Sequence, residues 1–227
     1  MKKIELTEDL IHALLILAGF IGFVVLGFVQ IMVALSVVSF GLLLFFNRKV
    51  FKELKPFGGY ANWVTIFRLA LLCALGFSFH LLNHLNLAIW AIIVLSLDGV
   101  DGLIARKMSM TSEFGGKLDG ETDAFFVLLM GSIVYQFKLA DYWILWPGLL
   151  RYFFVISCYV FWKKTWPEPV SYFRKTIAVI IMSALISPFL LAEKFYLPII
   201  IIATILVTYS FAKSFTFQWK QSRIYRS

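Results

Sequence analysis

The chain of 227 residues has few charged residues, and this scarcity excludes most soluble folds. Only 15% of the residues are Asp, Glu, Lys or Arg and 61% are hydrophobic, whereas an ordinary soluble domain has about 25% charged residues. So much apolar surface requires lipid as the solvent, and the composition predicts a helical protein that crosses a membrane several times. We expect no cleavable signal peptide, because the first apolar run is long enough to stay in the membrane.

Cysteine and histidine are also scarce. The two cysteines, Cys73 and Cys158, each lie in an apolar run, which excludes a disulfide framework and a cysteine-based metal site. The three histidines, His12, His80 and His84, share no metal-ligand spacing. We therefore interpret them as interfacial or packing residues.

Eight segments approach the length of roughly 20 apolar residues that spans a bilayer. They lie at 9–28, 30–46, 62–82, 86–105, 119–137, 142–162, 176–193 and 196–215. The first two are separated only by a tight turn near Val29 and Gln30, so a bent or re-entrant element is the alternative there. We predict an all-α transmembrane bundle with an N-terminal helix pair, residues 1–46, followed by a six-helix core within residues 47–227.

The basic residues indicate how the bundle is oriented. With both termini in the cytoplasm, 17 of the 21 Lys and Arg residues fall in cytoplasmic segments, as the positive-inside rule requires. Only Lys138 and Lys194 fall outside, whereas Arg68 and Arg151 lie within predicted spans. The net charge of +8 suits a surface that faces anionic lipid headgroups, and we expect no nucleic-acid partner.

Four carboxylates cluster where two predicted spans meet the cytoplasm. Asp98 and Asp101 are three residues apart and Asp119 and Asp123 are four apart, so each pair shares one helix face. A charge near the bilayer centre costs about 2.5–3.5 kcal/mol on insertion scales and usually marks a site. Divalent cations would remove the repulsion, and an all-oxygen cluster predicts Mg²⁺ or Mn²⁺, with two ions able to clamp a diphosphate. Ordinary loop carboxylates and the ion site of a divalent-cation transporter are the alternatives.

The segment that contains these carboxylates reads DGVDGLIARKMSMTSEFGGKLDGETD. It resembles the signature of the CDP-alcohol phosphatidyltransferase family, D-x2-D-G-x2-A-R-x8-G-x3-D-x3-D. Upstream, the run from Asn62 to Arg68 is similar to the N-x2-T-x2-R run that precedes the signature in many members. Every fixed position of the signature is matched, by Asp98, Asp101, Gly102, Ala105, Arg106, Gly115, Asp119 and Asp123.

The resemblance implies a membrane enzyme that transfers a phosphatidyl group from a CDP-linked lipid, chiefly CDP-diacylglycerol, to a hydroxyl acceptor and releases CMP. It implies that the four aspartates ligate two divalent cations at the cytoplasmic side and that Asp123 also acts as general base. A CDP-choline or CDP-ethanolamine headgroup transferred to diacylglycerol is the alternative within the family, and a homodimer is left open. The residues implied for the CDP donor are Asn62, Thr65, Gly102, Arg106 and Ser112.

Three cations are candidates for the acceptor site. Arg151 lies within a predicted span, and Arg174 and Lys175 open the next span; together they would suit a phosphorylated acceptor such as glycerol 3-phosphate or an inositol phosphate. The alternatives are that Arg151 snorkels or pairs with a structural carboxylate and that the other two are interfacial anchors. Phosphatidylglycerolphosphate synthases have Glu where Tyr152 stands here, which leaves the subfamily open. Glu168 is expected to be a solvated loop charge.

Overall fold

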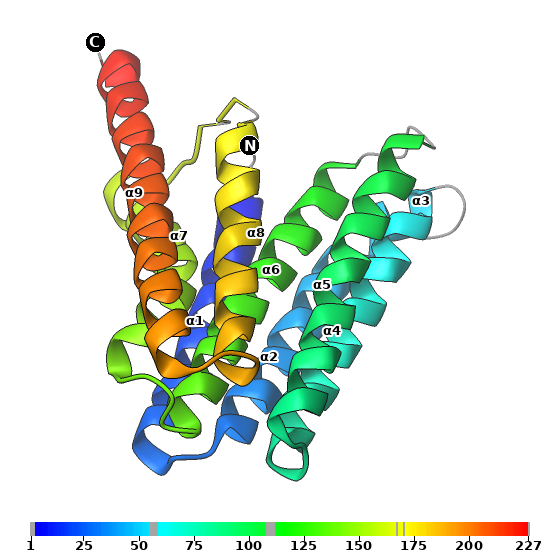
Figure 1. Ribbon diagram of the computed structural model, residues 1–227. Coiled ribbons are helices and arrows are strands. Elements are labelled where there is room, and N and C mark those ends of the chain that lie inside the picture. Colours follow the sequence, from blue (N-terminus) through cyan, green and yellow to red (C-terminus); the bar gives the residue numbers. More distant parts are fainter. Residues whose placement is uncertain (1–2, 55–58, 108–111, 167, 170, 227) are drawn as a thin grey trace.

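Long helices, packed side by side, make up the fold (Figure 1). The structure is a computed structural model that describes residues 3–54, 59–107, 112–166, 168–169 and 171–226, without the side chains of residues 3–6, 53, 100–107, 225 and 226. These ranges contain no strand. The helices in the described ranges are α1 (Lys3–Leu26), α2 (Val29–Phe46), α3 (Arg48–Glu53), α4 (Tyr60–Ser78), α5 (His84–Lys107), α6 (Glu113–Gln136), α7 (Trp146–Trp162), α8 (Tyr172–Ile186) and α9 (Glu193–Arg226). Three 3₁₀ turns accompany them, at Phe79–Leu81, Tyr142–Leu145 and Ser187–Phe189.

The eight long helices coincide with the eight predicted segments, which confirms the all-α transmembrane architecture. The apolar part of α5, His84–Gly99, is shorter than a full span, and the first half of α6 carries several charged residues. These two helices therefore bring polar groups into an apolar bundle. Six stretches of the described chain are apolar and long enough to cross a membrane, namely Thr7–Leu26, Val29–Phe46, Tyr60–Leu81, Tyr142–Trp162, Tyr172–Phe189 and Glu193–Ile224.

The N-terminal segment forms two separate helices, each apolar and long enough to cross a membrane. Gly27 ends α1 with a φ of +78°, a conformation that glycine adopts without a steric penalty, and its N–H bonds to the carbonyl oxygen of Phe23 at 2.7 Å. The pair packs on the rest of the bundle, with α1 against α7 and α2 against α4 and α6. The division at residue 46 remains a prediction.

Helix α6 lies at the centre of the bundle. Every residue from Phe125 to Val134 is buried, and the helix contacts α2, α4, α7 and α8. A stretch buried on all sides is surrounded by protein and not by lipid, so this part of α6 belongs to the core of the bundle. Small residues let the neighbours approach: a Cβ on Gly148 of α7 would lie 2.5 Å from the Cα of Leu128.

One end of the bundle carries both chain ends and the candidate site. In Figure 1, α1 begins and α9 ends at the same end, where α5 ends and α6 begins. The turns between α1 and α2, between α4 and α5 and between α8 and α9 lie at the opposite end (Figure 1). The signature carboxylates near the end of α5 and the beginning of α6 therefore share one side of the bundle with both termini.

Candidate active site

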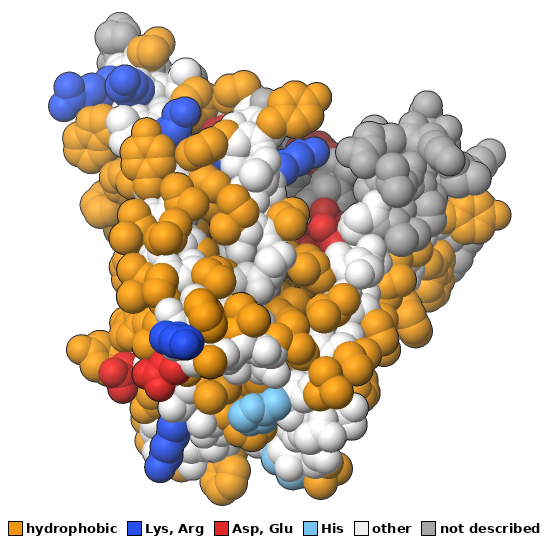
Figure 2. Space-filling view, in the orientation of Figure 1, with side chains coloured by type: hydrophobic (Ala, Val, Ile, Leu, Met, Phe, Trp, Pro, Cys, Tyr) orange, Lys and Arg blue, Asp and Glu red, His pale blue; other side chains and the backbone are white. Residues whose placement is uncertain are grey.

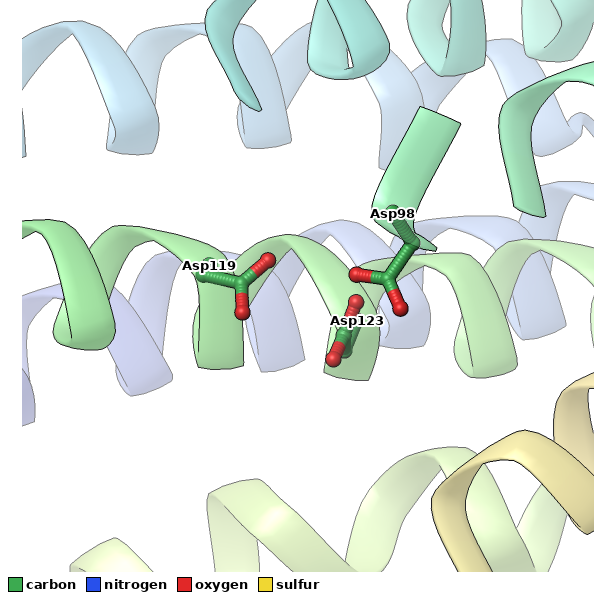
Figure 3. Close-up of side chains that lie close together, drawn as sticks. All are labelled: Asp98, Asp119 and Asp123. Atoms are coloured by element: carbon green, nitrogen blue, oxygen red, sulfur yellow. The ribbon is translucent and has the colours of Figure 1, made fainter. Parts of the chain in front are cut away.

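Three of the four predicted aspartates converge on one point. Asp98 comes from α5, Asp119 and Asp123 come from α6, and one carboxylate oxygen of each lies within 4.8 Å of the others (Figure 3). The two residues of α6 are one helical turn apart, so they share one face of that helix. The fourth predicted ligand, Asp101, falls outside the described side chains, as do Gly102 and Arg106.

Arg68 of α4 lies at the centre of this cluster, and the sequence had assigned it no role. Its side chain is buried, and Nη1 lies 2.7 Å from Oδ1 of Asp98 and 2.8 Å from Oδ1 of Asp119. Its Nη2 donates to Oδ1 of Asp123 at 2.7 Å. The signal that could have found it is the N-x2-T-x2-R run, because Arg68 shares the helix face of Asn62 and Thr65.

The charge and chemistry of the cluster fit a divalent cation. Three ionised carboxylates around one guanidinium leave two net negative charges on the described side chains. Charges held this close in a bundle surrounded by lipid are strongly repulsive unless further cations neutralise them. The donor set consists of carboxylate oxygens, which Mg²⁺ and Mn²⁺ prefer.

Two of the donor-side residues that the structure describes, Asn62 and Ser112, meet at Gly115. Asn62 and Thr65 are buried on α4, and the Ser112 hydroxyl caps α6 by accepting from the Gly115 N–H at 2.9 Å. A Cβ on Gly115 would lie 2.5 Å from Oδ1 of Asn62 and 2.9 Å from Oγ of Ser112. Glycine at this signature position therefore lets the two helices approach, and Asn62 and Ser112 are brought together.

The three predicted acceptor residues line one cavity together with Asp123. This cavity has a volume of about 340 Å³ and lies among α6, α7, α8 and α9. Figure 2 shows acidic side chains in a hollow between α8 and α5, with basic side chains close by. The structure thus brings Arg151, Arg174 and Lys175 to the same space as one member of the carboxylate cluster.

The three cations differ in their partners. Arg151 donates from Nε and Nη2 to Oε1 of Glu121, at 3.1 and 2.5 Å, so it pairs with a carboxylate, as the alternative interpretation held, while still lining the cavity. Arg174 is paired with Glu168. Lys175 has no ion-pair partner among the described residues and is exposed.

The sequence interpretation of Glu168 was wrong, and the sequence analysis assigned no role to Glu121. Glu168 is no solvated loop charge, because it also accepts from Ser214 at 3.0 Å and from Gln218 at 3.3 Å. Glu121 lies two residues from both Asp119 and Asp123, and two residues turn a helix by about 200°. That rotation places Glu121 on the opposite face of α6, which is the signal that could have separated it from the cluster.

Comparison with known protein families decides the class of protein. The sequence model described as CDP-alcohol phosphatidyltransferase matches residues 59–210. The chain belongs to the CDP-alcohol phosphatidyltransferase family. It is therefore a transferase that moves a phosphatidyl group from a CDP-alcohol.

The match to the CDP-alcohol phosphatidyltransferase family covers only part of the chain. It begins just before α4 and ends within α9, so it contains the carboxylate cluster, Arg68 and most of the cavity lining and leaves out α1 and α2. No curated protein and no solved structure gives a significant match.

Proposed function

We propose that this enzyme transfers the phosphatidyl group of a CDP-linked lipid, CDP-diacylglycerol, to a phosphorylated alcohol and releases CMP. The observation that carries the proposal is the position of Asp123. This residue belongs to the carboxylate cluster and also lines the cavity that contains Arg151, Arg174 and Lys175. One carboxylate therefore adjoins both the place for a diphosphate and the place for an acceptor.

On the donor side, Asp98, Asp101, Asp119 and Asp123 would hold two Mg²⁺ or Mn²⁺ ions. When bound, these ions would supply the positive charge that stabilises the diphosphate and the departing CMP. Arg68 orients the carboxylates, because its guanidinium contacts three of them at once. The resemblance to the family implies that Gly102, Arg106 and Ser112 would contact the CDP portion and that Asn62 and Thr65 would border the same pocket.

Asp123 would act as the general base. An alcohol is a poor nucleophile at neutral pH, and a carboxylate within reach can accept its proton as the new bond forms. The acceptor oxygen then bonds to the phosphorus that carries the lipid alcohol. The bond between that phosphorus and the oxygen of CMP breaks, and CMP leaves with the electron pair.

The basic lining of the cavity supports a phosphorylated acceptor. Two of its cations, Arg151 and Arg174, are each paired with one carboxylate, and Lys175 adds a further positive charge. A phosphate could accept a charge-assisted hydrogen bond from Lys175, which has no ion-pair partner among the described residues. A neutral or zwitterionic alcohol would gain much less from the same lining.

The orientation in the membrane follows from the basic residues. The site and both termini share one end of the bundle (Figure 1), and the positive-inside rule assigns that end to the cytoplasm. The enzyme would then take a water-soluble acceptor from the cytoplasm and a lipid donor from the adjoining leaflet.

An acceptor screen tests the proposal. Purified enzyme in detergent is given CDP-diacylglycerol and Mg²⁺ with glycerol 3-phosphate, inositol phosphate, serine or inositol, and CMP release is measured. We expect turnover with a phosphorylated alcohol and not with serine or unphosphorylated inositol. Turnover only with CDP-choline or CDP-ethanolamine and diacylglycerol would show that the CDP-linked headgroup is the donor and that the lipid is the acceptor. Divalent-cation flux into vesicles without any CMP release would indicate a transporter.

A further inference from the structure

The N-terminal helix pair, which lies outside the family match, reaches the acceptor cavity through one histidine. His12 of α1 is buried, and its Nε2 lies 3.6 Å from Oε2 of Glu121 on α6. Glu121 is also buried, with 2% of its surface exposed. Its other oxygen, Oε1, accepts both hydrogen bonds from Arg151. A continuous polar path therefore runs from α1 through α6 to the cavity.

The atoms of His12 and Glu121 that face each other form no hydrogen bond with any other described residue. Within the described part of the chain, Nε2 of His12 and Oε2 of Glu121 are both buried without a hydrogen bond. A buried carboxylate oxygen without a partner is costly in a low-dielectric interior, and the imidazole stabilises it when Nε2 carries the proton, with Ser39 donating to Nδ1. We therefore interpret the 3.6 Å approach of these two atoms as an electrostatic contact between the imidazole and the carboxylate.

Helix α2 holds the imidazole in this orientation. Oγ of Ser39 lies 2.8 Å from Nδ1 of His12 and 3.2 Å from its carbonyl oxygen. The ring of Phe40 meets the imidazole edge to face, with centroids 4.7 Å apart. A ring fixed at Nδ1 and packed on one face can present Nε2 in only one direction.

We propose that His12 is a positioning residue that orients Arg151 for the acceptor by fixing Glu121, so that the N-terminal helix pair forms part of the acceptor site. The inference rests on the proposed acceptor cavity. Arg151 contacts a single oxygen of Glu121, and a carboxylate held only through that oxygen can rotate. Contact at the second oxygen removes this freedom, as outer partners do for residues that bind a ligand.

A second cavity supports this role for the helix pair. It has a volume of about 360 Å³ and adjoins the first, sharing Arg151, Phe154, Glu168 and Arg174 with it. Asp9 of α1 and Asn47 at the end of α2 line its other side. The helix pair therefore forms a polar wall beside Arg151 in addition to the contact through His12.

The test compares two substitutions of similar size at His12, with inorganic phosphate as the probe. His12→Leu removes the polar contact, whereas His12→Gln keeps an N–H that can reach Glu121. Phosphate-dependent thermal stabilisation of the protein in detergent, with Mg²⁺ and excess CMP present, gives an apparent Kd. We expect His12→Leu to raise this Kd about tenfold, His12→Gln to raise it less than about threefold, and Arg151→Ala to raise it more than His12→Leu does while leaving a weak response at high phosphate.

A double variant shows whether the histidine acts through Arg151. In the Arg151→Ala background, His12→Leu should change the residual response no further, because coupled residues are not additive. If His12→Leu does not fold, Ser39→Ala releases the ring without removing it and should weaken phosphate binding about threefold. An unchanged Kd in that variant would overturn the inference.

The outcomes separate the two proposals. If phosphate does not stabilise the unsubstituted protein, or if Arg151→Ala responds normally, the acceptor cavity is misassigned and both proposals fail. If Arg151→Ala weakens phosphate binding while the Leu and Gln substitutions at His12 behave alike, the acceptor cavity stands and the positioning role of His12 is wrong.

Discussion

Arg68 on α4 and Asp123 on α6 lie 2.7 Å apart, from Nη2 to Oδ1, while Nη1 of the same guanidinium meets Asp98 and Asp119. A guanidinium is a rigid planar fork, so its contacts fix several oxygens relative to one another. Three helices are joined at this point, α4 through the arginine and α5 and α6 through the carboxylates. The position of the proposed base thus depends on a residue of a third helix.

We predict that Arg68→Lys lowers kcat for CMP release by about ten- to a hundredfold, the scale of one lost charged hydrogen bond. Lysine keeps the positive charge, but its ammonium group cannot reproduce the geometry of the fork. The rate is compared with that of the unsubstituted enzyme after size-exclusion chromatography has shown that the variant is folded. Full activity in a folded Arg68→Lys variant would show that charge alone suffices.

We predict that Asp123→Asn abolishes turnover in a folded protein. Asparagine is nearly the same size but cannot accept the proton of the acceptor hydroxyl. Asp119→Asn serves as the matched control, since we propose only a ligand role for that residue and added Mg²⁺ should partly restore its activity. Rescue of both variants by Mg²⁺ to the same extent would argue against Asp123 as the base.

We predict that EDTA removes all activity and that Mg²⁺ or Mn²⁺ restores it. The three described carboxylates outnumber the one guanidinium between them, and the CDP diphosphate adds more negative charge. CMP release is followed before chelation, after chelation and after each ion is added back, with Na⁺ as the control. Undiminished activity in EDTA would contradict the proposed role of divalent cations.

The architecture was predictable because it depends on local composition. Apolar runs marked the positions of all eight long helices, although six of the described stretches have the length and composition of a span and the helix ends differ by several residues from the prediction. The carboxylate cluster was predictable for a related reason, since spacings of three and four place pairs on one helix face whatever surrounds them.

Contacts between distant helices were not predictable in the same way. Arg68 and Glu121 carry charge in spans, but their partners depend on how α4, α6 and α7 are rotated against one another. His12 was interpreted as a packing or interfacial residue, because nothing in its neighbourhood points to Glu121, more than a hundred residues away. Such pairs are set by tertiary packing, which leaves no periodic pattern in a single sequence.

We predict that Gly115→Ala raises the KM for the CDP-linked donor while Gly116→Ala does not. A methyl group on Gly115 would lie 2.5 Å from Oδ1 of Asn62 and 2.9 Å from Oγ of Ser112, whereas one on Gly116 meets nothing within 4 Å. Displacing both side chains should raise the donor KM about tenfold, since hydrogen bonds of about 1–1.5 kcal/mol would be lost. Equal effects of the two substitutions would indicate a general helix effect instead.

We predict that Lys175→Gln raises the KM for a phosphorylated acceptor about tenfold and leaves the donor KM unchanged, the scale of one charge-assisted hydrogen bond. Lys175 lines the acceptor cavity, and within the described chain it has no ion-pair partner, whereas Arg151 and Arg174 are each held by a glutamate. Its charge is therefore the one most available to an incoming phosphate. Because Lys175 is exposed, added salt should weaken its contribution.

Lys194→Gln is the matched control for this substitution. Lys194 lies at the start of α9, at the opposite end of the bundle from the start of α8 (Figure 1). Steady-state kinetics with both substrates varied, at low and high salt, separate the possibilities. If Lys175→Gln and Lys194→Gln gave the same acceptor KM, the phosphate would have to be bound by the two paired arginines. The acceptor would then displace a glutamate from at least one of these arginines. The acceptor KM of the unsubstituted enzyme would in that case be higher than expected for binding by a free lysine, and it would depend little on salt.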